Sequence, residues 1–224
     1  MLKRDEKNCS SKLCAICGKM PATTLDHIPP KGIFPKPRPR LITVPACSSC
    51  NQESSKYDES FMVYLSLHVG MDSPESKRLW ERHAIKTVKH NRRLRNRLVT
   101  TMRPVYLRSP GGIITGPQMG SPWDDEAHDR VVERMIRGLY FYHFGEILGE
   151  RVLCKVQWLQ EIDKAIYEMF EPLQQNAIGN SQVLYRYGRA CDEPLGSIWL
   201  FQFYNRHWAS RYTQPVDQLV ELAT

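Results

Sequence analysis

Two stretches of sequence decide the fold of the N-terminal region: Cys14-Ala-Ile-Cys17 and Cys47-Ser-Ser-Cys50. Each is a C-x-x-C pair, and two such pairs supply the four thiolates of a closed, tetrahedral zinc site. The 29 residues between them exceed the roughly 15–20 of a simple zinc ribbon, so extra structure is inserted there. Two unrelated buried pairs, or a redox dithiol, are the other interpretations, but no βαβ unit typical of a redox C-x-x-C is visible. We therefore predict a structural zinc ion bound by Cys14, Cys17, Cys47 and Cys50.

Prolines crowd the segment between the two cysteine pairs. Seven of its residues are proline, which excludes a continuous helix or a central strand. We expect residues 18–46 to be mostly loop, held by the metal. The segment also carries Asp26 next to His27, and Asn51, a potential oxygen ligand, directly follows the second pair. A bare Asp-His pair is more often a turn residue beside a surface histidine, so its position between two zinc-binding motifs gives it weight.

These residues, in this order, resemble the HNH endonucleases, many of which build a ββα-metal core on a treble-clef zinc scaffold. The resemblance covers about residues 12–62, roughly a quarter of the chain. It rests on the following stretches: Cys14–Cys17, Asp26-His27-Ile28-Pro29, Val44-Pro45-Ala46-Cys47, Cys50-Asn51 and Lys56. It implies a small treble-clef-like zinc module that contains a ββα-metal motif.

The resemblance also implies a role for each site residue. His27 would be the general base that activates water against a backbone phosphodiester, and an unperturbed histidine pKa near ~6.5 suits that task. Asp26 and Asn51 would hold a catalytic divalent ion, Mg²⁺ or Mn²⁺, which stabilises the charge on the leaving oxygen. The zinc ion, closed by four thiolates, would only hold the scaffold.

One position departs from the family's pattern. The family usually has an asparagine a few residues before the second cysteine pair, where it braces the active-site loop and orients the base. This chain has Leu41-Ile42-Thr43-Val44-Pro45 instead, and Thr43 is the nearest polar residue. The site is then either an active variant or a degenerate one that does not cleave, and we favour the active variant because Asp26, His27 and Asn51 are all present.

The rest of the chain alternates between helical and strand patterns. Asn51 is a candidate N-cap for a helix that ends before Gly70, and further helices are expected over about 74–98, 124–148 and 159–171. Aromatic and alternating residues predict strands over about 182–212, where Trp199 and Phe201 are more often core residues than base-stacking platforms. We predict an α+β fold with two domains. Residues 1–72 form the zinc-bound module, and residues 73–224 form a mostly helical body with a C-terminal antiparallel sheet.

The charge of the chain is basic. Lys plus Arg exceed Asp plus Glu by 31 to 24, a formal net charge of +7 with a sequence pI near 9.1, so a polyanionic partner is expected. We predict nucleic acid, with DNA favoured over RNA, and assign its phosphates to cations of the loop between the cysteine pairs: Lys31, Lys36, Arg38 and Arg40. The predicted helix at 74–98 carries nine more Lys or Arg, but such a run is as often a solvated face.

We see neither a membrane span nor a secretory signal in the sequence. No apolar run approaches the ~18 residues of a membrane span, and the charged start at Met1–Lys7 lacks the apolar core of a signal peptide, so we expect a cytoplasmic protein without membrane contact. Whether the chain forms a homodimer is left open. Two other functions also stay open, namely a non-catalytic zinc module that binds nucleic acid and a protein-interaction module.

Overall fold

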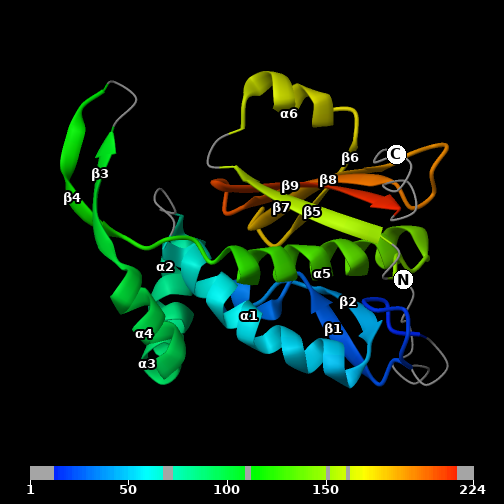
Figure 1. Cartoon of the computed structure of the whole chain (residues 1–224), viewed down its shortest axis with the longest axis horizontal. Helices are drawn as coiled ribbons and strands as arrows, with labels where there is room; N and C mark the ends of the chain where they lie inside the picture. Colours follow the sequence, from blue (N-terminus) through cyan, green and yellow to red (C-terminus); the bar gives the residue numbers. More distant parts are fainter. Residues whose placement is uncertain (1–12, 68–72, 109–111, 150–151, 160–161, 216–224) are drawn as a thin grey trace, which may run out of the picture.

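Helix α5 (Asp125–Phe144) lies between two layers that contain β-strands. The structure, a computed structural model, describes residues 13–67, 73–108, 112–149, 152–159 and 162–215. On one side α5 packs against the C-terminal sheet, and on the other it contacts the N-terminal strands and the long helix that follows them (Figure 1). The α+β fold class is therefore confirmed.

The N-terminal layer contains two strands and one long helix. Strand β1 (Thr24–Ile28) pairs antiparallel with β2 (Ile42–Ala46), a short 3-10 turn η1 (Lys31–Ile33) follows β1, and α1 (Ser48–Leu67) follows β2. The prediction that residues 18–46 are mostly loop is wrong for these strands. A two-stranded ribbon has open edges on both sides, so β2 accommodates Pro45. Asn51 is not the N-cap, because α1 begins at Ser48.

The helix predicted over 74–98 is interrupted. Helix α2 (Pro74–Leu79) continues through a π-helical turn η2 (Trp80–Ala84) into α3 (Ile85–His90), and α4 (Arg92–Thr101) then starts anew. Asn91 separates the last two because its backbone is extended and its side chain accepts a hydrogen bond from the Leu94 amide, as an N-cap does.

Helix α5 is shorter than the predicted 124–148. Asp124 caps its start by accepting from the Ala127 amide, and Gly145 ends it in the left-handed conformation at φ 75°. Ile147 and Leu148 continue the apolar pattern past this glycine, and for this reason the predicted helix extended beyond Phe144.

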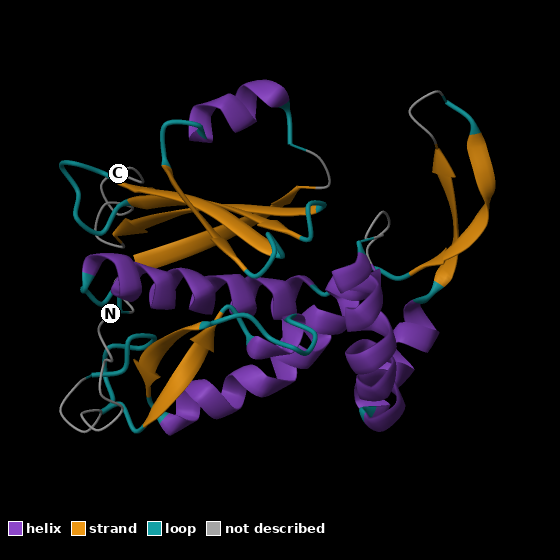
Figure 2. Cartoon of the chain, turned by 180° about the vertical axis from the view of Figure 1, so that it is seen from behind, coloured by secondary structure: helices purple, strands orange, loops and turns teal. Residues whose placement is uncertain are grey.

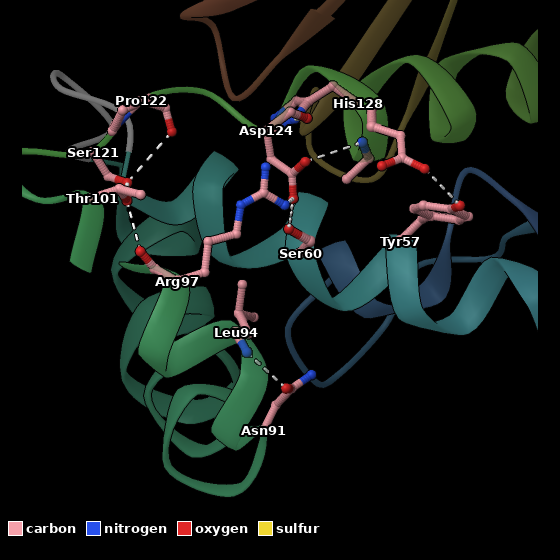
Figure 3. Close-up of polar contacts among 12 residues, drawn as sticks. Tyr57, Ser60, Asn91, Leu94, Arg97, Thr101, Ser121, Pro122, Asp124 and His128 are labelled. Carbon is pink, nitrogen blue, oxygen red and sulfur yellow. Dashed lines mark hydrogen bonds and ion pairs between the residues drawn. The ribbon is translucent and has the colours of Figure 1, made fainter. Parts of the chain in front are cut away.

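A polar junction fixes α5 against α1 and α4 (Figure 3). The buried Asp124 carboxylate accepts from Ser60 Oγ on α1 at 2.5 Å and pairs with Arg97 on α4 at 2.7 Å. Its backbone carbonyl lies 2.6 Å from His128 Nδ1. Asp124 therefore caps one helix and ties two others to it.

The C-terminal layer is a five-stranded antiparallel sheet in the order β5-β9-β8-β7-β6. Its strands are β5 (Val152–Leu159), β6 (Gln174–Ile178), β7 (Val183–Arg189), β8 (Ser197–Phe203) and β9 (His207–Pro215). The predicted C-terminal antiparallel sheet is confirmed, but it is larger than 182–212 because β5 and β6 also belong to it. The helix predicted over 159–171 is only α6 (Lys164–Phe170), since Leu159 ends β5.

The aromatic residues of β7 and β8 form the core beneath the sheet. Trp199, Phe201 and Phe203 are fully buried, and their rings stack on one another and on Tyr185 of β7. They belong to the same apolar cluster as Val44 of the N-terminal layer. The aromatic stretch is therefore core, as the alternation predicted.

A two-stranded arm projects away from the three layers (Figures 1 and 2). It consists of β3 (Arg103–Arg108) and β4 (Ile114–Gly120), which pair antiparallel. Tyr106, Ile114 and Met119 are all more than half exposed on it. The sequence did not predict this arm.

Two remaining expectations concern boundaries and membranes. The division into domains 1–72 and 73–224 stays a prediction, and its residues 1–12 and 68–72 lie outside the described part of the chain. Among the helices that the structure describes, none combines the length and apolar character that a membrane crossing needs.

Candidate metal centre and active site

The first cysteine pair sits on a tight turn that is tied to β2. Leu13 and Pro21 form a β-bridge, the Cys14 amide donates to the Met20 carbonyl, and Gly18 adopts φ 69° in the turn. The Ala15 amide donates to the Pro45 carbonyl in β2. The turn thereby lies beside the start of α1, which carries Cys50.

The four predicted zinc ligands converge. The sulfur atoms of Cys14, Cys17, Cys47 and Cys50 all lie within 4.8 Å of one another, and Cys17 Sγ is 4.0 Å from Cys47 Sγ. A tetrahedral zinc ion with Zn–S bonds of about 2.3 Å separates its sulfur ligands by about 3.8 Å. The cluster is therefore of the size that holds a zinc ion.

Asp26 points inward from β1. It is only 5% exposed, and its Oδ2 lies 3.4 Å from Nε of Arg134 on α5. The same guanidinium donates from Nη2 to Asp58 Oδ1 on α1 at 2.5 Å. Two carboxylates thus share one arginine between β1, α1 and α5.

The cluster has two carboxylates but only one guanidinium, and burial disfavours the charged form of both acids. Burial raises the pKa of Asp26, and the nearby Arg134 only partly opposes this. Burial likewise raises the pKa of Asp58 to about 6, against the effect of Arg134. Asp26 Oδ2 accepts no hydrogen bond from any described residue. Two carboxylates beside one guanidinium carry a net formal charge of −1, which a proton or a cation would neutralise.

His27 lies on the opposite face of β1 from Asp26. Asp26 pairs with the buried Val44 in the ladder, whereas His27 pairs with the exposed Thr43. Burial lowers the pKa of His27, and the nearby cations Lys31 and Arg38 lower it further, while Asp26 acts in the opposite direction. The half-buried imidazole is therefore neutral at pH 7 and able to accept a proton.

Asn51 contacts β1 from the first turns of α1. Its Nδ2 donates to Thr24 Oγ1 at 3.1 Å and to the Leu25 carbonyl at 3.5 Å. Its Oδ1 accepts no hydrogen bond from the described residues. Asp26 and Asn51 therefore lie on the α1 side of β1, whereas His27 lies on its other face, so the structure does not bring all three predicted site residues to one face of the strand.

The four predicted phosphate-binding cations are exposed on the loop between β1 and β2. They are Lys31, Lys36, Arg38 and Arg40. Arg38 Nε donates to the Lys31 carbonyl at 3.1 Å, so this part of the loop folds back on itself beside His27.

Two residues of this cluster, Asp58 and Arg134, were not predicted as site residues from the sequence. Arg134 follows the buried Val131 and Val132 and precedes the buried Met135 on α5. An arginine inside the apolar stretch of a helix is a signal for a buried ion pair, because such residues are almost never buried without a partner.

Comparison of the chain with models of known protein families, with curated proteins and with solved structures gave no match.

Proposed function

We propose that the protein is a metal-dependent endonuclease of the HNH type that hydrolyses phosphodiester bonds of nucleic acid. The observation that carries this proposal is the position of His27: a half-buried imidazole with a lowered pKa, flanked by Lys31 and Arg38, on a strand tied to the four-cysteine cluster. In this proposal β1, β2 and α1 are the ββα-metal motif, and the cysteine-bearing turn completes a treble clef.

His27 would remove a proton from water. A neutral imidazole is the form that accepts this proton, and the two cations beside it would hold the phosphate that the resulting hydroxide attacks. Since those cations also disfavour a charged imidazole, they help to keep His27 in its basic form at neutral pH.

The donor set on the α1 side fits a hard cation. Asp26 Oδ2 and Asn51 Oδ1 are oxygen atoms that no described residue engages as hydrogen-bond acceptors, and oxygen ligands are what Mg²⁺ and Mn²⁺ prefer. When bound, such an ion would stabilise charge on the leaving oxygen, which requires the phosphate to extend past β1 from the His27 face to the α1 face. Arg134 lies beside Asp26 and competes for it, so the ion would have to displace this guanidinium or share the carboxylate with it.

The four-cysteine cluster would hold zinc in a structural role. Four thiolates fill a tetrahedral coordination sphere and leave no open position for a substrate. The ion would hold the first turn against β2 and the start of α1, and so fix the strand that carries His27.

Nicking of supercoiled plasmid tests the proposal. The wild-type protein should convert plasmid to the open-circle form with Mg²⁺ or Mn²⁺, and His27→Ala should reduce the rate at least about 100-fold, the usual contribution of a general base. His90→Ala, at an exposed histidine at the end of α3, is the matched control and should cleave like wild type. An inactive wild type with both metals, or equal rates for wild type and His27→Ala, would contradict the proposal.

The ion pair between Arg134 and Asp26 favours a second candidate, a non-catalytic zinc module that binds nucleic acid. In that case the guanidinium permanently replaces the divalent ion. Salt-sensitive binding of DNA without any cleaved product, together with metal-independent affinity, would favour this second function.

A further inference from the structure

Cations between β1 and β2 lack acidic partners. Within the described residues, no carboxylate lies within 4.0 Å of Lys31, Lys36, Arg38 or Arg40. Several other arginines are neutralised, among them Arg134 by Asp58 and Arg189 by Glu146. The loop is therefore a place where positive charge accumulates.

The π-helical turn η2 brings more cations to the same region. Both η1, in the loop between β1 and β2, and η2 contact α1, so the loop and the turn share one supporting helix. Leu79 and Ala84 anchor the turn in the core, and Arg82 and Lys86 are exposed. A π-helical turn inside an α-helix is costly and occurs frequently at functional sites.

His83 marks the place where the loop and the turn meet. It is half-buried on η2, and burial lowers its pKa. Four cations lower that pKa further, two from the loop (Arg38 and Lys36) and two from the helix (Lys86 and Arg82). Arg38 also lowers the pKa of His27, so it lies near both histidines.

We infer that these residues bind the phosphate backbone of nucleic acid and extend the substrate path from His27 to η2. We call the five residues the His83 surface: Lys36, Arg38, Arg82, His83 and Lys86. Glu81 in the turn and Glu59 beside Lys86 offset part of this charge, but the cations outnumber them. A polyanion relieves the remaining repulsion among the cations and releases its own counterions as it binds. Neutral His83 adds a hydrogen-bond donor for a phosphate oxygen. The inference rests on the proposed function but is tested by binding rather than by cleavage.

Binding is measured with the full-length His27→Ala protein, so that no substrate is cut. The probe is a labelled duplex DNA of about 20 base pairs, titrated by fluorescence anisotropy across a salt series. Replacing two phosphate-contacting cations, Arg82→Gln with Lys86→Gln, should weaken binding at least about 10-fold and reduce the slope of log K against log salt by about 2. The matched control is Arg92→Gln with Arg93→Gln on exposed positions of α4, which should bind like the parent. Equal affinity of both double variants would overturn the inference.

His83 is tested separately. His83→Leu should weaken binding about 5-fold, the loss of one hydrogen bond, and His83→Gln should restore it because the amide also donates. Thermal unfolding checks that both variants fold. If His83→Gln binds as weakly as His83→Leu while remaining folded, the donor role assigned to His83 is wrong.

Two further binding experiments identify the ligand and separate this inference from the nuclease proposal. Single-stranded DNA and an RNA duplex of matched sequence report which nucleic acid is preferred, and binding of either supports a backbone-reading surface. Polyglutamate that binds as tightly as DNA would overturn it, because the surface would then select charge alone. Salt-sensitive binding that needs Arg82 and Lys86, in a protein that never cleaves, would leave this surface standing and refute only the nuclease.

Discussion

Thr43 lies directly opposite His27 in the antiparallel pair of β1 and β2. Directly opposed side chains on one face of such a pair have Cβ atoms about 4.5–5.5 Å apart, within reach of a hydrogen bond between hydroxyl and imidazole. Thr43 therefore occupies a position from which a residue can orient the proposed base. In the proposed nuclease, Thr43 would take the orienting role that an asparagine has in HNH endonucleases.

Replacing Thr43 by valine should slow cleavage about 10-fold, the value of one lost hydrogen bond of about 1.4 kcal/mol in the transition state. Valine keeps the β-branched shape, so the strand should persist. Thr43→Asn should restore or exceed the wild-type rate. Thr100→Val, on an exposed position of α4, is the control for loss of a threonine hydroxyl. Wild-type plasmid nicking by Thr43→Val would contradict the orienting role.

Arg134→Gln should lower the free energy of unfolding by about 3 kcal/mol, because it leaves the buried Asp26 carboxylate and the half-buried Asp58 carboxylate without their shared cation. Urea denaturation at pH 7 measures the loss. Arg189→Gln, which breaks the partly exposed pair with Glu146, should destabilise the fold far less than Arg134→Gln does. Equal losses in the two variants would show that the Arg134 cluster is not a buried ion network.

Cys14→Ser should remove bound zinc and destabilise the N-terminal layer. Zinc binding to four thiolates supplies folding energy, so a loss of about 3 kcal/mol or more is expected, which lowers the Tm of a chain of this size by about 10 °C. Elemental analysis and thermal unfolding are the measurements, and wild type should hold about one zinc per chain. Cys191→Ser, at an exposed cysteine outside the cluster, should change neither quantity. A folded, metal-free wild type would remove the structural zinc from the proposal.

His128 should make the fold sensitive to acid. Burial lowers its pKa to about 4, whereas the unfolded chain has a histidine pKa near 6.5. The folded state therefore favours the neutral ring, and its contribution is fully present above pH 6.5 and is lost as the pH falls toward 4. Between pH 7 and 4.5 the wild type should lose about 2 kcal/mol more stability than His128→Phe, measured by urea denaturation at both values. Parallel losses in both proteins would assign the acid sensitivity to other groups, such as the thiolates.

Local motifs allowed the zinc ligands to be predicted. The two C-x-x-C pairs carry their own geometry, because two cysteines separated by two residues can bind one ion whatever structure connects the two pairs. The four sulfur atoms meet as expected. The order of β1, β2 and α1 came from the resemblance, since prolines in the segment pointed to loop.

The partner of Asp26 had no such local signal. Arg134 lies 108 positions farther along the chain, on a helix that was predicted from its apolar stripe. Periodicity places a residue on a face of its own element, but it does not say which element covers that face. The Arg134 cluster follows from the packing of α5 on α1 and β1, which only the folded chain shows.

Two of the strands that were not predicted, β4 and β6, lack the residue pattern of a strand. In β6 four of five residues are exposed, so there is no alternation to read, and β4 contains both Gly116 and Pro117, which the sequence presents as loop residues. Both strands owe their conformation to pairing with a neighbour rather than to their own composition.

The projecting arm has one more property that follows from its composition. Each of its strands carries a proline, Pro104 in β3 and Pro117 in β4. Proline offers no amide hydrogen, so a strand from another molecule that docks along either flank meets a gap in the ladder. The arm thus combines exposed apolar side chains with edges that oppose the edge-to-edge growth that turns exposed ribbons into fibrils.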